Sequence, residues 1–289
     1  MKRYTFTVPS GVTSGRLLPL AIRMLPELPE HVIREAFENR DVKMDGFRVG
    51  RNDTAVPNAE VCLYAAYAEE ERQASFIYAD DNLLIIRKPA GMSCEEDAKG
   101  GKTVALWVCE SLRKSDPAAQ PPLLCHRLDN QTEGLLLLAT NNKTQDELVS
   151  AFAHRQIHKG YICLVCGTPE PSFKRIEAYL YKDAAHGKVH IANKPGTGAL
   201  RIVTEYKVLT SGEVSRLHIV LHTGRTHQIR AQMAAIGHPL VGDDLYGDRV
   251  MNRRLKAKRL MLCATDLSFS LTGALAYMNE KHIQIEPRF

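Results

Sequence analysis

The stretch with the strongest potential for chemistry is a run of polar residues that leads directly into a run of leucines. It reads Leu124-Cys-His-Arg-Leu-Asp-Asn-Gln-Thr-Glu-Gly-Leu-Leu-Leu-Leu-Ala139. His126, Arg127 and Asp129 precede a segment that is typical of a buried strand. A loop that feeds a buried strand is a rigid place to hold a reactive side chain. The alternative is that Asp129 only caps a turn.

A second segment gathers cations where a helix is expected to begin. It reads His222-Thr-Gly-Arg-Thr-His-Gln-Ile-Arg230. Gly224 allows a tight turn, and Thr223 or Thr226 can cap the helix that follows. Cations at a helix N-terminus oppose the helix dipole, so they do not serve helix stability. A bound carboxylate or phosphate explains them, and a solvated basic helix start is the alternative.

Other patterns suggest binding sites but are incomplete. Gly100-Gly-Lys-Thr103 ends like a phosphate-binding loop, but Glu96 stands where the motif needs a glycine. Cys163-Leu-Val-Cys166 has no second pair, so we expect structural thiols in a strand. Asp243-Asp244 is expected to shape a turn. Three histidines that are close in the sequence lack the spacing of metal ligands: His222, His227 and His238. We therefore expect no metal site.

The composition limits the class of protein. The chain has 289 residues, which is near the length of two domains of about 150 residues each. Its 44% hydrophobic and 25% charged residues are ordinary for a soluble globular protein and exclude a collagen-like or wholly disordered chain. A net charge of +5 permits a polyanionic partner without requiring one. Neither a membrane span nor a secretory signal is recognisable, and seven irregularly spaced cysteines favour a reduced, cytoplasmic setting.

The elements that must position these residues are predicted from hydrophobic periodicity. The acidic run Ala68-Glu-Glu-Glu-Arg72 is the expected boundary between two domains, 1–68 and 73–289. In the first, we expect a helix over 30–40, a hairpin turn at Asp45-Gly46 and a strand over 61–64. In the second, we expect strands over 75–78, 83–87, 134–140, 161–167, 202–209 and 217–222, and helices over 146–153 and 226–236, the last ended by Gly237. This mixture favours an α+β fold with a long mixed or antiparallel sheet.

Together, the two polar segments resemble the RluA-type family of RNA pseudouridine synthases. The matching stretches are His126-Arg-Leu-Asp129 with Thr132, Gly134 and the leucines, Lys159-Gly-Tyr161 through Gly167, Thr223 to Arg230 with Gly237-His-Pro-Leu-Val-Gly-Asp243 and Leu245-Tyr-Gly247, and Asp80 through Lys88-Pro-Ala-Gly91. They follow one another in the family's order. The resemblance spans roughly residues 75 to 270.

The resemblance implies a role for each polar residue. Asp129 corresponds to the catalytic aspartate, Tyr161 to the tyrosine packed against the target base, and Arg225 to the partner of the aspartate. The residues expected to contact the substrate are His126, Arg127, Thr132, His227, Gln228 and Arg230. A carboxylate can act as a nucleophile or stabilise a cationic sugar centre, and a guanidinium keeps it ionised. Whether Asp129 attacks the sugar or the base stays open, and no metal or organic cofactor is needed.

The chain departs from the family pattern at two positions. Glu133 stands where the family often has a small residue, and it can either point inward toward Asp129 or face solvent. Cys263 stands where family members tend to carry histidine. Residues 1–68 resemble, more weakly, the small alpha-L RNA-binding module. A run of cations can follow an RNA backbone or be plain solvated surface: Arg249, Arg253, Arg254, Lys256, Lys258 and Arg259.

We therefore predict an RNA pseudouridine synthase, an isomerase that acts as a cytoplasmic monomer on structured RNA. Large-subunit ribosomal RNA is the expected substrate, and transfer RNA is the alternative. A catalytically silent RNA-binding factor for ribosome assembly is a rival interpretation. A base-releasing glycosylase is another, but glycosidases need a second carboxylate, and Glu133 is the only nearby candidate in the sequence.

Overall fold

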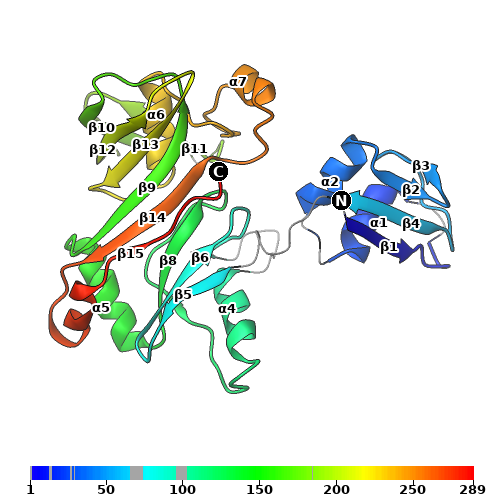
Figure 1. The fold of residues 1–289 in the computed structure, drawn as a ribbon, viewed down its shortest axis with the longest axis horizontal. Coiled ribbons are helices and arrows are strands. Elements are labelled where there is room, and N and C mark those ends of the chain that lie inside the picture. The colour runs from blue at the N-terminus through cyan, green and yellow to red at the C-terminus, as the bar shows by residue number, and fades with distance from the viewer. Residues whose placement is uncertain are drawn as a thin grey trace. The chain divides into compact units, whose positions relative to one another are not determined.

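The chain folds into two compact units, Met1–Glu71 and Arg72–Phe289, which are considered separately (Figure 1). The computed structural model describes residues 2–12, 15–26, 28, 30–65, 74–95, 103–183 and 185–289. The acidic run at 68–72 lies outside the described residues, as does most of the Gly100–Thr103 pattern. No helix among the described residues is long and apolar enough to cross a membrane.

The N-terminal unit combines two helices with a small sheet of strand order β1-β4-β2-β3. Its elements are β1 (Lys2–Thr7), α1 (Leu17–Met24), α2 (Glu30–Glu38), β2 (Val42–Met44), β3 (Phe47–Arg48) and β4 (Glu60–Ala65). The predicted hairpin is confirmed, since β2 pairs antiparallel with β3. Asp45 and Gly46 both take positive φ at its turn, which is the conformation that a tight hairpin turn requires. Buried apolar side chains from both helices and the sheet form one core.

The C-terminal unit is built on one long sheet with the strand path β11-β10-β12-β13-β9-β14-β8-β6-β5. The strands are β5 (Ser75–Ala79), β6 (Leu83–Lys88), β7 (Leu123–Leu124), β8 (Glu133–Ala139), β9 (Ile157–Cys166), β10 (Phe173–Asp183), β11 (Lys188–Ala192), β12 (Leu200–Thr210), β13 (Val214–Leu221), β14 (Leu262–Phe269) and β15 (Ile283–Gln284). Neighbouring strands of the path run antiparallel except β14 and β8, which are parallel. The prediction of an α+β fold with a mixed sheet is confirmed.

The helices of this unit lie against the sheet or beside it. They are α4 (Val104–Leu112), α5 (Asn142–Ala153), α6 (Gln228–Ala235), α7 (Arg249–Arg254) and the 3-10 helix η1 (Gly273–Glu280). The predicted stop of α6 at Gly237 is confirmed by its φ of +89°. The predicted threonine cap is wrong. His227 occupies the N-cap position of α6 in a left-handed conformation, and its side chain makes no capping hydrogen bond.

Strand β8 is buried on both faces, which explains its unbroken run of leucines. Leu136 and Leu138 face a core that α4 covers, whereas Leu135 and Leu137 face a second core that α5 and η1 cover. Because successive side chains of a strand point to opposite faces, a strand that is covered on both sides needs apolar residues throughout. The polar loop before β8 is therefore attached to the most deeply buried strand of the sheet.

Strand β14 completes the centre of the sheet although it comes late in the chain. It lies between β9 and β8 (Figure 1). Ala264 of β14 pairs with Gly134 on one side and with Tyr161 on the other. This arrangement brings the start of β8, and the loop that holds Asp129, next to the middle of β9, which holds Tyr161.

Gly134 is required where β8 meets β14. It has a φ of +125°, and a Cβ atom there would lie 2.3 Å from the carbonyl oxygen of Ala264. We expect Gly134→Ala to lower the free energy of unfolding of the C-terminal unit by about 2–4 kcal/mol, because it combines backbone strain with overpacking. Urea unfolding followed by the fluorescence of Trp107, the single tryptophan, reports on this unit.

A matched control for this change is Gly212→Ala. A Cβ atom at Gly212 meets its nearest neighbour, the carbonyl oxygen of Val214, at 3.4 Å, and its φ is not in the left-handed region. Equal losses of stability in the two variants would contradict the close approach of β8 and β14.

Candidate functional site

A cleft of about 900 Å³ opens in the C-terminal unit and gathers the residues of both polar segments. Its lining includes the predicted catalytic residues Asp129, Tyr161 and Arg225. It also includes every residue predicted to contact substrate: His126, Arg127, Thr132, His227, Gln228 and Arg230. The two segments are about a hundred residues apart in the sequence, so the fold brings them together.

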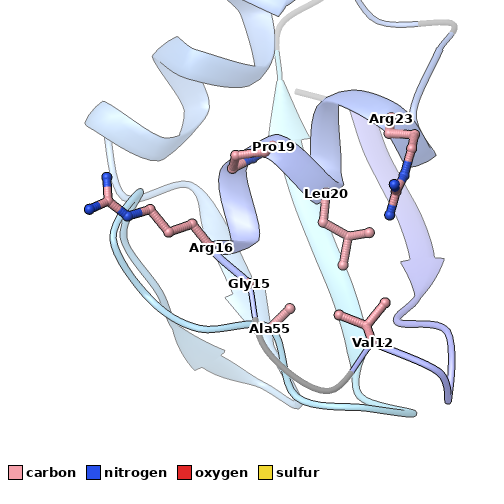
Figure 2. Close-up of a pocket in the computed structure, with 7 residues that line it drawn as sticks. All are labelled: Val12, Gly15, Arg16, Pro19, Leu20, Arg23 and Ala55. Atoms are coloured by element: carbon pink, nitrogen blue, oxygen red, sulfur yellow. The ribbon is translucent and has the colours of Figure 1, made fainter.

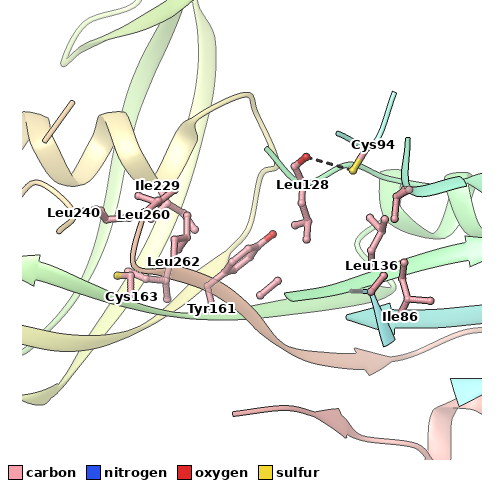
Figure 3. Packing of buried hydrophobic residues seen from close by; sticks show 14 of the residues in the cluster. Ile86, Cys94, Leu128, Leu136, Tyr161, Cys163, Ile229, Leu240, Leu260 and Leu262 are labelled. Atoms are coloured by element: carbon pink, nitrogen blue, oxygen red, sulfur yellow. Dashed lines mark hydrogen bonds between the residues drawn. The ribbon is translucent and has the colours of Figure 1, made fainter. Parts of the chain in front are cut away.

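Asp129 lies in the loop between β7 and β8, and its side chain is 24% exposed. The turn is closed by a hydrogen bond from the Thr132 amide to the Asp129 carbonyl oxygen, at 3.0 Å. The preceding Leu128 is buried in the core, and its carbonyl oxygen accepts a hydrogen bond from the Cys94 thiol (Figure 3). The backbone of Asp129 is thus fixed on both sides while the carboxylate faces the cleft.

Lys88 fixes the backbone of this loop through hydrogen bonds from its buried ammonium group. It is fully buried, and its ammonium group donates to the carbonyl oxygens of Pro89 at 3.0 Å, Met92 at 2.8 Å and Asn130 at 3.0 Å. Burial lowers the pKa of Lys88 to about 8. The Lys88-Pro-Ala-Gly91 stretch therefore serves the site by fixing the residue next to Asp129.

We expect Lys88→Met to slow the chemistry of this site by about 10²-fold without loss of fold. The methionine fills similar space, but three carbonyl oxygens lose their donor, and a displacement of about 1 Å in a reactive group costs that order of rate. Single-turnover rates compared with those of Lys114→Met, a change at an exposed lysine of the same unit, would test this. A Lys88→Met rate equal to that of the control would show that the ammonium does not position the loop.

Tyr161 lies in the middle of β9 and is only 4% exposed. Figure 3 shows its ring directed from β9 toward Leu128, beside Leu262 of β14. Burial, and next the nearby charge of Asp129, raise the pKa of the Tyr161 phenol far above its ordinary value. The phenol therefore stays protonated, and the residue presents an aromatic surface next to the carboxylate.

The structure pairs Asp129 with a different arginine from the one predicted. The nearest guanidinium nitrogen belongs to Arg230, 3.9 Å from the Asp129 Oδ2 atom. Among the described residues, no ion pair joins Arg225 to Asp129, and Arg225 is exposed at the mouth of the cleft. Arg225 precedes the first turn of α6, whereas Arg230 lies on the buried face of that helix. The predicted partnership of Arg225 with Asp129 is therefore wrong.

Arg230 is held by a buried ion pair. Its side chain is 3% exposed and donates two hydrogen bonds to Asp243, at 2.7 and 2.8 Å, while the Asp243 side chain is fully buried. A third bond reaches Asp244 at 3.0 Å, and the guanidinium lies 5.5 Å from the centre of the Tyr246 ring. The Asp243 carboxylate also accepts from two backbone amides of its turn, as the sequence predicts. The remaining nitrogen of Arg230 faces Asp129.

The side chain of Gln228, although it belongs to the lining of the cleft, is hydrogen-bonded within the protein at both ends. Its side-chain oxygen accepts from the Thr223 hydroxyl and from the Arg225 amide, at 2.9 and 3.1 Å. Its side-chain nitrogen donates to the Val203 carbonyl and to the Thr204 hydroxyl, at 3.2 and 2.9 Å. The amide is buried with both ends occupied, so Gln228 fixes the basic loop to β12.

His126 is also bound to the scaffold. Its Nε2 atom accepts a hydrogen bond from the Leu137 amide at 3.0 Å, and its ring packs on Phe152 at 4.6 Å between centroids. Burial lowers the pKa of His126 well below its ordinary value, and the charge of Lys159 acts in the same direction. The ring is therefore neutral, and it accepts from Leu137 in the second half of β8.

Glu133, where the chain departs from the family pattern, neither points at Asp129 nor faces solvent. It is buried, and the Arg87 Nε atom donates to it at 2.7 Å. Arg288 and Arg259 approach it at 3.7 and 3.9 Å. It is not among the residues that line the cleft. No second carboxylate of the kind that a glycosidase needs is therefore supplied by Glu133.

The cleft is rich in positive charge. Its arginines and lysines are Arg127, Arg155, Lys159, Lys182, Arg225 and Arg230, and its acidic residues are Glu95 and Asp129. Glu95 pairs with Arg127. Burial lowers the pKa of Lys159 to about 8, and its ammonium lies 5.1 Å from the centre of the Phe152 ring. Such a lining suits a phosphate backbone.

The run of cations between Arg249 and Arg259 is only partly available to bind ligands. Arg254 pairs with Glu213, and Arg259 donates to the Arg288 carbonyl oxygen at 2.6 Å. Arg249, Arg253 and Lys256 are exposed on or next to α7. The run therefore combines internal contacts with exposed charge.

No group of three or more metal-binding side chains occurs among the described residues. The three histidines weighed as ligands have separate partners: His222 contacts Glu205, His227 contacts Tyr246, and His238 contacts the Cys166 carbonyl oxygen. The seven cysteines are free thiols, as the irregular spacing predicts.

Sequence reasoning missed the supporting residues of the site, above all Lys88, Asp243 and Tyr246. Each lies inside a stretch that carries the family resemblance. The order of these stretches in the chain indicated that they belong to the site, but it could not show which side chains hold Asp129 and Arg230 in place. Those contacts depend on the packing of α6 and of the loops around it.

Curated relatives match most of the chain. The ribosomal large subunit pseudouridine synthase C of Vibrio cholerae is 31% identical over 226 residues, which cover 76% of this chain and 67% of the relative. The protein of that name from Escherichia coli is 30% identical over 243 residues, which cover 81% and 72%. The one from Vibrio parahaemolyticus is 33% identical over 204 residues, which cover 69% of this chain and only 62% of the relative.

Solved structures share the fold. The human RNA pseudouridylate synthase domain containing 4 superposes with a TM-score of 0.60 at 23% identity, covering 74% of this chain and 88% of that one. The human RNA pseudouridylate synthase domain containing 1 gives a TM-score of 0.57 at 25% identity, covering 74% and 82%. The model of the RNA pseudouridylate synthase family matches residues 82–235, which include Asp129, Tyr161 and Arg230. The chain therefore belongs to the RNA pseudouridylate synthase family.

Proposed function

We propose that this chain isomerises uridine to pseudouridine in large-subunit ribosomal RNA, with Asp129 as the reacting carboxylate. The observation that carries the proposal is the position of Asp129 in a basic cleft, between the Arg230 guanidinium at 3.9 Å and the buried ring of Tyr161. The substrate is suggested by the relatives, whose names refer to the ribosomal large subunit.

The reaction moves the ribose from one atom of uracil to another. The bond from ribose C1′ to uracil N1 breaks, and a bond from C1′ to C5 forms, so the RNA keeps its mass. A carboxylate beside C1′ can attack as a nucleophile or stabilise positive charge on the sugar. Arg230 places a positive charge 3.9 Å from that carboxylate.

The detached uracil must turn without leaving the enzyme. Tyr161 supplies an aromatic face at the floor of the cleft, and its protonated phenol keeps the surface neutral. The target nucleotide must first leave its stack, at a cost of a few kcal/mol. The exposed cations Arg225 and Arg127 of the cleft lining would contact phosphates of the bound RNA.

We assign RNA binding to the N-terminal unit as well, as an alpha-L-like module over residues 1–68 next to a catalytic domain over 73–289. A hollow of about 180 Å³ on this unit has Arg16, Arg23 and Leu20 in its lining. Figure 2 shows Leu20 between the two arginines. None of the described residues that line the hollow is acidic.

The test is to incubate the purified full chain with unmodified ribosomal and transfer RNA transcripts and to map pseudouridine at single-nucleotide resolution. Modification at one or a few uridines of the large-subunit RNA is expected. Modification of transfer RNA alone would show that transfer RNA, and not large-subunit ribosomal RNA, is the substrate. Tight RNA binding without any product would favour a silent RNA-binding factor, and release of free uracil would indicate a glycosylase.

A further inference from the structure

We propose that His227 is the base that removes the proton from C5 of the uracil during the isomerisation. The proposal rests on the proposed function and adds a catalytic residue to it. Three observations carry it: the position of the imidazole beside Asp129, its fixed orientation against Tyr246, and its strained backbone at the start of α6.

The chemistry requires such a base. When C1′ becomes bonded to C5, that carbon carries both the sugar and its original hydrogen, and a double bond joins N1 to C6. The C5–H bond then breaks and its electron pair forms the C5=C6 double bond. The π electrons of N1=C6 move to N1, which takes a proton from water. The proton from C5 goes to the base, which later releases it to water, so the uracil isomer has the same composition as the substrate.

The base must lie close to the carboxylate that reacts at C1′. Among the described residues, two basic side chains approach the Asp129 carboxylate within 4.0 Å: Arg230 and His227. A guanidinium stays protonated and cannot serve as a base. Tyr161 is the other polar group at this point, but its pKa is raised by burial, so it does not supply a phenolate. His227 is the group that can accept the proton.

The imidazole is held in a defined orientation. Its Nδ1 atom lies 3.0 Å from the Tyr246 hydroxyl, and the two rings meet edge to face at 5.7 Å and 74°. The Tyr246 oxygen also accepts a hydrogen bond from the Val189 amide at 2.9 Å, which anchors it to β11. The Nε2 atom points the other way and stops 4.0 Å from Asp129 Oδ2, beyond hydrogen-bond distance.

For His227 to act as this base, the proton of its neutral ring must lie on Nδ1, donating to the Tyr246 oxygen, and the lone pair on Nε2. Two atoms with lone pairs, Nε2 and Oδ2, would then face each other without a hydrogen bond, as their 4.0 Å separation indicates. The reacting carbon atoms would lie in the cleft beside these two atoms, C1′ next to Oδ2 and C5 next to Nε2.

The backbone of His227 supports a functional role. Its φ of 52° lies in the left-handed region, which few residues other than glycine adopt without cost. The side chain makes no capping hydrogen bond to α6, so helix capping does not explain the conformation. Strain of this kind persists at sites where the surroundings hold a side chain in place for function. Here it directs an imidazole that is 16% exposed into the cleft.

The charges around His227 suit a base at neutral pH. Burial lowers the pKa of His227 most strongly, and the Arg230 charge also lowers it. The negative charges of Asp129, Asp243 and Asp244 act in the opposite direction but do not outweigh the burial. The free imidazole is therefore neutral near pH 7, and once it takes up a proton, the Asp129 carboxylate stabilises the imidazolium.

The test uses the full chain and an RNA in which the target uridine carries deuterium at C5. For His227→Asn, we expect the single-turnover rate to fall by about 10²–10⁴-fold, which is the usual contribution of a general base. Removal of the C5 proton then becomes the slowest step, so deuterium should slow the variant severalfold more than it slows the wild type. The wild-type rate should rise with pH through an inflection below the ordinary histidine value of about 6.5, and the variant should lack that inflection.

Controls separate this role from a structural one. His190→Asn changes an exposed histidine that pairs with Asp183 outside the cleft, and it should leave rate and isotope effect unchanged. Added imidazole should partly restore the activity of His227→Ala. A His227→Asn protein with an unchanged isotope effect, or with the wild-type pH profile, would overturn the proposal. Absence of pseudouridine with the wild-type chain would instead overturn the proposed function.

Discussion

Asp129→Asn is expected to lower the single-turnover rate of pseudouridine formation by about 10⁴-fold or more, since removal of a reacting nucleophile has effects of that order. Asparagine has almost the same shape, and the loop around Asp129 is fixed by backbone contacts and by Lys88. The fold should therefore be retained. RNA affinity should stay within a few-fold of the wild type, because the cations of the cleft supply the contacts to phosphates.

The comparison of Asp129→Asn with the wild type needs a control in which another aspartate is changed to asparagine. Asp146→Asn makes the same substitution at an exposed position of α5 and should leave the rate unchanged. Rates would be measured with enzyme in excess over RNA, and affinity by filter binding at a stated salt concentration. If Asp129→Asn still forms product at a rate near that of the wild type, another group reacts at C1′.

Asp243→Asn is expected to destabilise the C-terminal unit by about 3 kcal/mol, because it removes one partner of a buried ion pair. Arg230 would then remain buried beside a neutral amide, while the amide oxygen could still accept from the turn. The rate of product formation should also fall, since the orientation of Arg230 beside Asp129 depends on the two hydrogen bonds from its guanidinium to Asp243. Urea unfolding by Trp107 fluorescence and single-turnover kinetics would measure the two effects.

Asp244→Asn provides a matched control at the same arginine. Asp244 contacts Arg230 at 3.0 Å, but its side chain is 69% exposed, so its loss should cost about 0–1 kcal/mol. A loss of stability in Asp243→Asn no larger than this would show that burial does not strengthen the Arg230–Asp243 pair.

The difference in free energy of unfolding between the wild type and Asp243→Asn should also depend on pH. Burial alone would raise the pKa of Asp243, but the hydrogen bonds and charge of Arg230 outweigh it and hold the pKa below its ordinary value. A lowered pKa in the folded state means that the pair stabilises the protein above the unfolded value of about 3.9. That contribution is lost as the pH falls through the folded value. The gap between wild type and Asp243→Asn should therefore be full at pH 7 and shrink in strong acid.

Strands with a simple burial pattern could be predicted from the sequence, and others could not. The leucine run of β8 indicates a strand covered on both faces, and the structure confirms it. Strand β10 was not predicted, because its sequence FKRIEAYLYKD is charged and lies mostly at the surface. Strand β14 was not predicted either, since it has few β-branched residues and its place in the sheet depends on pairing with β9 and β8. Tertiary pairing decides such segments.

The candidate site shows the same limit. The two polar segments were identified from residue types and spacing, and the fold places both in one cleft. The choice between Arg225 and Arg230 could not be made, because it depends on where α6 begins and which of its faces is buried. The left-handed His227 at the N-cap determines where α6 begins and therefore which face of the helix is buried. Nothing in the local sequence indicates a left-handed residue at that position. Likewise, the arginines around Glu133 come from distant parts of the chain.

The central place of β14 has a consequence for synthesis of the protein on the ribosome. Asp129 precedes the strand on one side of β14, and Tyr161 lies in the strand on the other side. Until β14 emerges, β8 and β9 each present an edge that lacks its neighbour, and the two halves of the site are not joined. Domains form as their chain is completed, with the N-terminal parts first. A nascent chain can thus fold its first unit while it is still catalytically incomplete, and activity begins only after β14 has been released.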